Sequence, residues 1–287
     1  MSTTTLSARA IGKDRPMLFG VPRYVVASLA AVLSLFPFAF MVLGAFKDSG
    51  EFLDNPFGLP RDLTFANFGG LLTAEFGRYF LNSIVITGVS VVATCVLGCL
   101  AAYPLSRMRT RLNSPVMLVF LIGLMIPIHI TLLPIYVLTQ NLGLYNTLAA
   151  MFGPFIAFSL PVTIYVLSGF FQQIPESVLD AARMDGAGHG RVFTKMVVPL
   201  SMPAISTVAV INFIFAWNEF IFALVLLSSP ENFPIPLGLT QFSAQYRVDV
   251  PGVMAALTVA SLPSILFFLA AQEKVVSGLA AGAVAGE

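Results

Sequence analysis

Several apolar stretches of about 20 residues or more restrict the possible folds of this chain more than any other feature. A helix needs about 20 mostly apolar residues to cross the hydrocarbon core of a bilayer. Hydrophobic residues make up 57% of the 287 positions and charged residues only 10%, with a mean hydropathy of +0.88. Soluble domains carry roughly a quarter charged residues. The sequence therefore predicts an all-α integral membrane protein.

The apolar stretches predict six transmembrane helices, at about 25–46, 79–105, 114–139, 147–170, 204–227 and 252–271. The third contains Pro127 and Pro134, so we expect it to be bent or broken. The first is too long for a signal peptide and lacks a cleavage site, so we expect it to be retained. The predicted organisation is a tail at 1–24, the first helix at 25–46, a polar segment at 47–78, a transmembrane core at 79–271 and a tail at 272–287.

The basic residues are distributed unequally between the two sides of this six-helix topology. Both tails, the short loop 106–113 and the loop 174–203 share one side, which holds Arg9, Lys13, Arg15, Arg23, Arg107, Arg109, Arg111, Arg183, Arg191, Lys195 and Lys274. The other side holds Lys47, Arg61, Arg78 and Arg247. The positive-inside rule places the richer side in the cytoplasm. We therefore expect cytoplasmic termini, a cytoplasmic 174–203 loop and an extracytoplasmic 47–78 segment.

The sequence offers no candidate catalytic or metal site. A G-x-x-x-x-G-K-[ST] phosphate loop is absent, because Gly12-Lys13 is followed by Asp14 and lacks the upstream glycine. Cys95 and Cys99 lie one turn apart in an apolar run without histidine or carboxylate neighbours, which is more typical of packing than of metal binding. A net charge of +1 and the lack of a basic, aromatic patch argue against nucleic acid. We expect a protein that is not an enzyme and binds no cofactor or metal itself.

The longest polar-rich interruption in the second half of the chain is the 174–203 loop. Pro175 suits the first position of a helix, and Gly186 suits its end because glycine readily adopts the left-handed conformation. A second helical run, 191–198, precedes Pro199. Arg183 follows Asp180 by three residues and could pair with it. These residues predict a helix–turn–helix, which could be either a solvated hairpin or a docking element.

Short motifs along the chain resemble type I ABC importer permeases. Asp180-Ala181-Ala182, followed by Asp185-Gly186-Ala187 and later by Pro199, resembles the cytoplasmic "EAA" loop of that family. The strings YFLNS at 79–83 and GLYNT at 143–147 resemble further family motifs, and WNEF at 217–220 and GLAAGAV at 278–284 resemble its carbohydrate-uptake branch, which contains the maltose permease's second subunit. Two departures are Asp180 in place of the usual glutamate and Ala285 in place of a lysine. Together and in order, these strings are specific to the family.

The resemblance implies the permease subunit of an ATP-driven, binding-protein-dependent importer in a prokaryotic inner membrane, which moves solute by alternating access. The implied partners are a second permease subunit, two cytoplasmic ATPase subunits that bind ATP and Mg, an extracytoplasmic solute-binding protein and membrane lipid. The residues that the resemblance assigns to ATPase docking are Asp180, Ala181, Ala182, Arg183, Asp185, Gly186, Ala187 and Pro199.

The solute implied by the resemblance is a sugar or an oligosaccharide. Glycerol phosphate or another polar solute is an alternative, and so is a self-sufficient secondary transporter or channel, which should show inverted repeats or several intramembrane charges. Glu219 lies within the fifth predicted helix, where an ionisable group is costly unless it faces a cavity or a partner. It could line the solute pathway with Asn212, Trp217 and Asn218, or it could fix packing between two permease subunits while Trp217 fills space.

Overall fold

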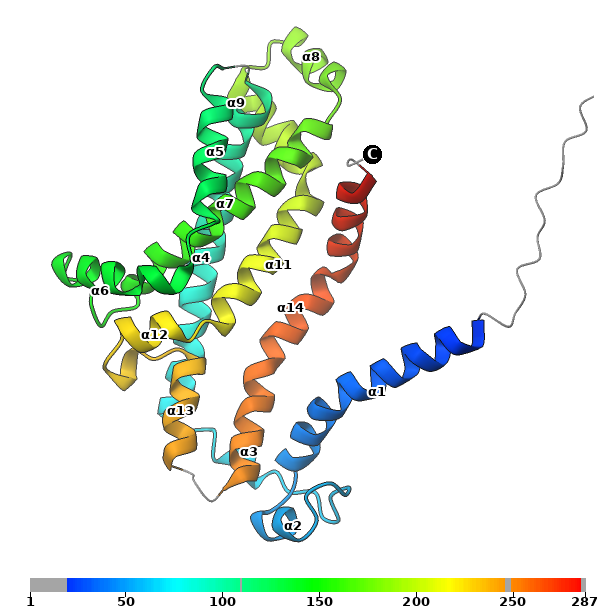
Figure 1. Cartoon of the computed structure of the whole chain (residues 1–287), viewed down its shortest axis with the longest axis vertical. Helices are drawn as coiled ribbons and strands as arrows, with labels where there is room; N and C mark the ends of the chain where they lie inside the picture. The colour runs from blue at the N-terminus through cyan, green and yellow to red at the C-terminus, as the bar shows by residue number, and fades with distance from the viewer. Residues whose placement is uncertain (1–19, 109, 246–248, 285–287) are drawn as a thin grey trace, which may run out of the picture.

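The computed structural model describes residues 20–108, 110–245 and 249–284, and helices form most of them, without a strand in these ranges (Figure 1). The N-terminal residues 1–19, Arg109, Arg247 and Ala285 lie outside the described residues. The α-helices are α1 (Gly20–Ala45), α2 (Ser49–Asp54), α3 (Ala66–Gly69), α4 (Ala74–Arg107), α5 (Asn113–Gly123), α6 (Leu132–Asn141), α7 (Ala149–Gln173), α8 (Glu176–Met184), α9 (His189–Val192), α10 (Val198–Leu200), α11 (Met202–Asn218), α12 (Ile221–Leu226), α13 (Ile235–Gln245) and α14 (Val250–Val284). Short η elements lie at Ile128–Thr131, Phe193–Val197 and Pro230–Asn232.

Six membrane spans can be drawn through the described residues. Four helices are individually long and apolar enough, over Tyr24–Ala45, Glu75–Arg107, Ala149–Gln173 and Val250–Ala270. Two further pairs of helices are long and apolar enough only when the two members are taken together, and each pair has a sharp bend between its members. Asn113–Gly123 and Ile128–Asn141 meet at 88°, and His189–Leu200 and Met202–Asn218 meet at 72°. The prediction of a broken third span is confirmed, and the predicted number of six spans is reached when each bent pair is counted as one span.

The last two spans differ from their predicted forms. A continuous fifth helix at 204–227 was wrong, because α11 ends at Asn218 and α12 starts at Ile221. The Pro-rich segment 228–251 contains α13. The final helix, α14, continues to Val284, beyond the predicted end at 271, so most of the expected tail is helical. Several alanines in 272–284 favour this continuation, because alanine is the strongest helix former.

The core lies where α4, α7 and α11 pack together. The most extensive contacts in the described chain join α4 to α7, and α11 contacts both of them and α14. A Cβ atom on Gly98 would lie 2.5 Å from Cγ2 of Thr163, so the absence of a side chain lets α4 approach α7 closely. Asn212 on α11 donates a 2.9 Å hydrogen bond to the Thr163 hydroxyl. Small and hydroxyl-bearing residues are typical of helix interfaces in membranes.

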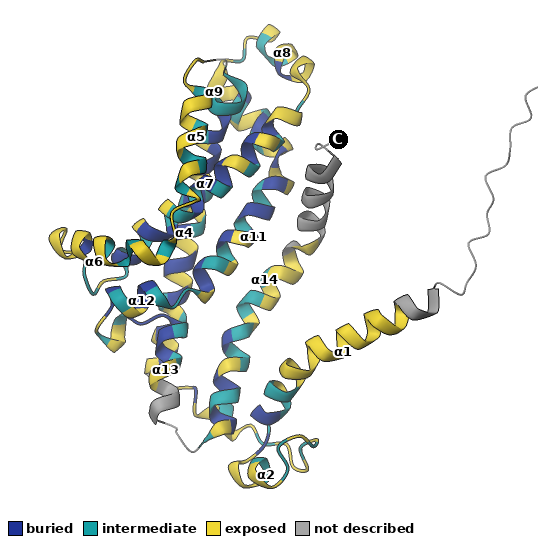
Figure 2. Ribbon diagram, viewed as in Figure 1, coloured by how far each residue is buried: buried dark blue, intermediate teal, exposed yellow. Residues whose placement is uncertain are grey.

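The polar segment between α1 and α4 folds onto the end of α1 rather than forming a loose loop. Lys47 is fully buried, and its ammonium group donates to the backbone carbonyls of Asn55 (2.6 Å), Pro56 (3.3 Å) and Gly58 (2.6 Å). The amide of Asn67 donates to the carbonyls of Ala45 and Lys47. Figure 2 shows the contrast with α1, whose residues from Tyr24 to Ala39 are exposed.

Candidate functional site

The first arm of the 174–203 loop is the amphipathic helix α8, which lies at one end of the molecule (Figure 1). Leu179 is fully buried in a cluster that includes Phe171 of α7 and Val192 of α9. Asp180 and Ala181 are exposed on the opposite side. Pro175 is the N-cap of α8, and its ψ of 133° turns the chain out of α7. The sequence predicted Pro175 one position later, as the first residue of the helix. The buried leucine therefore leaves a polar and small-residue face available to a partner.

The end of α8 is a Schellman motif. Gly186 adopts a positive φ of 80°, a conformation that favours glycine. Its N–H donates to the Arg183 carbonyl, and the N–H of Ala187 donates to the Ala182 carbonyl, both at 3.0 Å. This pattern satisfies carbonyls that a helix end leaves unpaired. The predicted helix stop at Asp185-Gly186 is confirmed, and the small residues Ala182 and Ala187 meet across the motif.

The exposed face of α8 carries a chain of ion pairs. Arg183 lies 2.8 Å from the Asp180 carboxylate, as predicted, and 3.2 Å from that of Glu176. Its hydrogen bonds to Glu176 and then Asp180 raise the pKa of the guanidinium, which is charged at physiological pH in any case. Exposed pairs of this kind add little to stability. Their effect is to orient the Arg183 and Asp180 side chains along the helix.

The second arm of the loop is a continuous helical segment, His189–Leu200, that is distorted before it joins α11. The π turn Phe193–Val197 ends with the Val198 N–H donating to the Phe193 carbonyl. Pro199 lacks an N–H and cannot complete the α-helical pattern, which accounts for distortion at this point. This helical segment begins at His189 and ends at Leu200, so it is longer than the predicted run at 191–198. The 72° bend between this segment and Met202–Asn218 comes immediately after Leu200.

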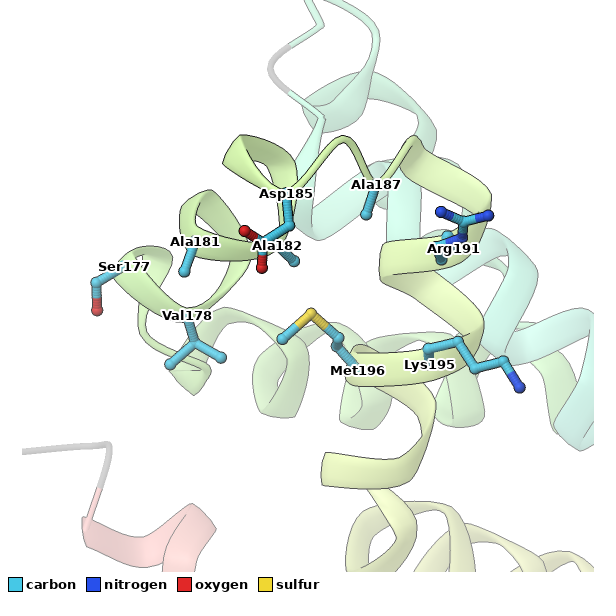
Figure 3. A pocket seen from close by; sticks show the side chains of 9 residues that line it. All are labelled: Ser177, Val178, Ala181, Ala182, Asp185, Ala187, Arg191, Lys195 and Met196. Carbon is cyan, nitrogen blue, oxygen red and sulfur yellow. The ribbon is translucent and has the colours of Figure 1, made fainter.

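A groove of about 710 Å³ lies between the two arms (Figure 3). One wall contains Ala181, Ala182 and Asp185, which the sequence predicted as docking residues. The other wall contains Arg191, Lys195 and Met196, which were not among the predicted docking residues. Arg191 and Lys195 are four residues apart on a helical run, and this spacing would have indicated that they share a face. Among the other predicted docking residues, Ala187 lines the groove, and Asp180 and Arg183 form an ion pair on α8. Gly186 caps the end of α8, and Pro199 lies just before the bend that leads into α11.

The four predicted pathway residues do not form one cluster. Asn212 is buried against Thr163 inside this chain. Trp217 is also buried, stacks on Phe213 with ring centroids 5.5 Å apart, and donates from its indole N–H to the Ala260 carbonyl at 3.2 Å. These contacts agree with the space-filling interpretation of Trp217.

Glu219 lies in the break between α11 and α12. Its carboxylate accepts hydrogen bonds from the backbone N–H groups of Ile221 (2.9 Å) and Phe222 (3.0 Å) and so caps the start of α12. The neighbouring Asn218 is exposed and, with Trp217, lines a second groove of about 730 Å³ that involves α11, α13 and α14. The Glu219 side chain therefore stabilises the interrupted helix, while Asn218 lines the groove and donates to the Ile214 carbonyl at 2.8 Å.

Comparison with known protein families identifies the family of this chain. Residues 94–280 match the model of the "binding-protein-dependent transport system inner membrane component". This chain belongs to that family. The match covers α5 to α13 completely, together with the 174–203 loop, the C-terminal part of α4 and most of α14.

Individual relatives of this inner membrane transport component align over nearly the full chain. A putative ABC transporter permease of Caldicellulosiruptor is 39% identical over 92% of this chain and 96% of its own. The trehalose/maltose transport system permease of Thermococcus litoralis is 34% identical over 91% of this chain and 95% of its own. A crystal structure of a bacterial ABC transporter that imports the acidic polysaccharide alginate has a chain with a TM-score of 0.73, at 23% identity, covering 94% of this chain and 99% of that one. The fold is therefore that of an ABC importer permease.

Proposed function

We propose that this inner membrane transport component imports a sugar or oligosaccharide by ATP-driven alternating access, with the 174–203 loop as its contact to separate ATPase subunits. The observation that carries the proposal is the construction of α8. One leucine, Leu179, anchors it to the spans, while Asp180, Ala181 and Asp185 face outward. Small side chains let another surface approach the helix backbone closely. ATP and Mg would be bound by the ATPase subunits, not by this chain.

The distribution of charge supports a cytoplasmic position for the 174–203 loop. Arg183 lies in α8, Arg191 in α9 and Lys195 just after it, Arg107 pairs with Glu176 of α8, and Arg111 follows in the connection between α4 and α5. The opposite end carries Lys47, Arg61 and Arg78, of which Lys47 is buried. The C-terminal end of α14 lies on the α8 side (Figure 1). We infer that both chain ends are cytoplasmic and that α2 and α3 are extracytoplasmic.

The proposed mechanism needs two states of a pair of permeases. Closure of the ATPase subunits on ATP would draw the two docked α8 helices together, and the attached spans would open the pathway outward. Hydrolysis would return the pair to the inward-facing state. A solute-binding protein delivers the solute, and this chain supplies half of the pathway.

Docking can be tested by co-purification. The tagged chain should bring its ATPase subunits with it, and Ala181→Trp on the outward face of α8 should remove most of them and abolish uptake. Leu53→Trp is the matched control, because Leu53 is exposed on α2 at the opposite end of the molecule. The proposal fails if no ATPase co-purifies with the unaltered chain, or if Ala181→Trp behaves like Leu53→Trp.

The solute class is tested on the partner solute-binding protein. The trehalose/maltose relative and the alginate importer both carry carbohydrates, which supports a sugar for this chain. Calorimetric titration with monosaccharides, disaccharides, longer oligosaccharides and glycerol phosphate should give saturable binding only with a carbohydrate. Binding of glycerol phosphate alone would favour the phosphorylated polyol instead.

A further inference from the structure

The last turn of α4 is fixed by the residues that follow it. The amide of Asn113 donates to the carbonyls of Pro104 (3.3 Å), Leu105 (3.2 Å) and Met108. The Ser106 hydroxyl donates to the Ala102 carbonyl at 2.7 Å. The Leu105 carbonyl is among the groups that the end of a helix leaves without an intrahelical partner, and the other bonds tie the same turn to Asn113 and Ser106. The backbone that carries Arg107 is therefore held in place.

Arg107 reaches from this turn to the junction between α7 and α8. Its side chain is only 8% exposed. One guanidinium nitrogen donates to the carbonyls of Phe171 and Ile174, at the end of α7, and the other lies 3.1 Å from the carboxylate of Glu176, the first residue of α8. The carbonyl end of a helix carries partial negative charge, which favours a cation there. A single side chain thus joins the ends of α4 and α7 to the start of α8.

The contact extends along the exposed face of α8. The second carboxylate oxygen of Glu176 accepts from Arg183, which also binds Asp180. Arg107 is therefore connected through Glu176 and Arg183 to Asp180, in the docking face. Because the planar guanidinium offers several donors in a fixed geometry, it sets an angle as well as a distance.

The same turn of α4 also contacts the second arm of the loop. The hydroxyl of Tyr103 lies 3.5 Å from Nδ1 of His189, and its ring centroid is 5.1 Å from that of Phe193. One turn of α4 therefore touches both arms of the 174–203 loop. We propose that Arg107 is a positioning residue, which holds α8 at a fixed angle to α4 and α7 so that movement of the docked helix is passed to the spans. This inference rests on the proposed function.

The experiment compares the assembled importer in lipid nanodiscs with Arg107→Gln, Arg107→Lys and Glu176→Gln variants. Arg111→Gln is the matched control, since Arg111 is exposed in the connection that follows α4 and its replacement removes the same charge. The measurements are the amount of ATPase retained, ATP hydrolysis, and solute taken up per ATP hydrolysed. Arg107→Gln should retain its ATPase but lose about fivefold or more in uptake per ATP, the scale of an ordinary coupling free energy. Glu176→Gln should lose about twofold, and Arg107→Lys should fall between the unaltered chain and Arg107→Gln.

The outcomes separate this inference from the proposed function. Absence of ATPase from the unaltered chain would contradict the docking proposal itself. Retained ATPase together with unchanged uptake per ATP in Arg107→Gln would overturn only the positioning role. If Arg107→Gln fails to assemble, Glu176→Gln and Arg107→Lys decide. Glu176 is 56% exposed, so its substitution should not unfold the chain. Uptake per ATP equal to that of Arg111→Gln in both variants would also overturn the inference.

Discussion

At the scale of single residues, Gly98 determines how closely α4 and α7 pack. Gly98→Ala places a methyl group 2.5 Å from Cγ2 of Thr163, and relieving this overlap should cost about 1–3 kcal/mol of unfolding free energy. Thr163→Ser removes the opposing methyl group and keeps the hydroxyl that accepts from Asn212. The double variant should therefore be more stable than Gly98→Ala alone. Thermal unfolding in detergent measures each variant.

The control for Gly98 is Gly88→Ala on the same helix, where an added Cβ meets no atom within 4 Å in the described structure. Its unfolding midpoint should remain close to that of the unaltered chain. Equal midpoints for Gly88→Ala and Gly98→Ala, or no recovery in the double variant, would show that the two helices do not approach at this point.

Gly186 supports the cap of α8 through its backbone conformation. A side chain at a φ of 80° costs about 1–2 kcal/mol, so Gly186→Ala should loosen the Schellman motif and reduce the ATPase that co-purifies with the chain. Gly188→Ala is the control, because its φ of −71° and ψ of 168° suit any residue. The outcome against this prediction is equal retention of ATPase by the two variants.

At the scale of elements, Asn146 joins the turn between α6 and α7 to the segment after α12. Its side-chain oxygen accepts from the N–H groups of Ser228 and Ser229, both at 2.9 Å, and its amide donates to the Ser229 hydroxyl at 2.7 Å. Asn146→Ala leaves two backbone donors without this acceptor and should cost about 1–3 kcal/mol. Asn146→Asp keeps the acceptor oxygen and should cost less. Thermal unfolding in detergent ranks the variants, and equal midpoints would contradict the role of the side chain.

The elements also show why some of the fold could be predicted and some could not. Apolar runs of sufficient length located the spans, and Pro127 and Pro134 indicated the break in the third. The break between α11 and α12 has no proline at its position. It depends on Glu219 accepting hydrogen bonds from Ile221 and Phe222, an interaction that a hydropathy pattern cannot reveal.

The candidate site shows the same division between local and distant information. The cap of α8 follows from local sequence, because Gly186 and the alanines around it form the Schellman motif within a few residues. The contact between Arg107 and Glu176 joins positions 69 residues apart, so it requires the folded arrangement of α4 and α7. Sequence spacing could suggest the pairing of Arg183 with Asp180 but could not bring Arg107 to the same face.

At the scale of the whole molecule, the inferred orientation can be tested because the two ends offer exposed positions. Leu112 follows α4 at the end that contains α8, and Leu72 precedes α4 at the opposite end; both side chains are exposed. In a chain with Cys95 and Cys99 replaced by serine, Leu72→Cys should react with a membrane-impermeant maleimide in intact cells. Leu112→Cys should react only after the membrane is opened, because the Arg-rich end is expected to remain in the cytoplasm.

Each labelled variant should first be shown to support solute uptake, so that only chains inserted in the working orientation are compared. Lys47 adds to the difference in exposed positive charge between the two ends. It is buried and bound by three carbonyl groups, so the end that contains α2 and α3 has one fewer exposed cation to favour the cytoplasm. The reverse labelling pattern would place α8 outside the cell, where no ATPase could reach it, and would overturn both the orientation and the docking of α8. Labelling of both positions in intact cells would contradict the assignment of α4 as a single membrane crossing between Leu72 and Leu112.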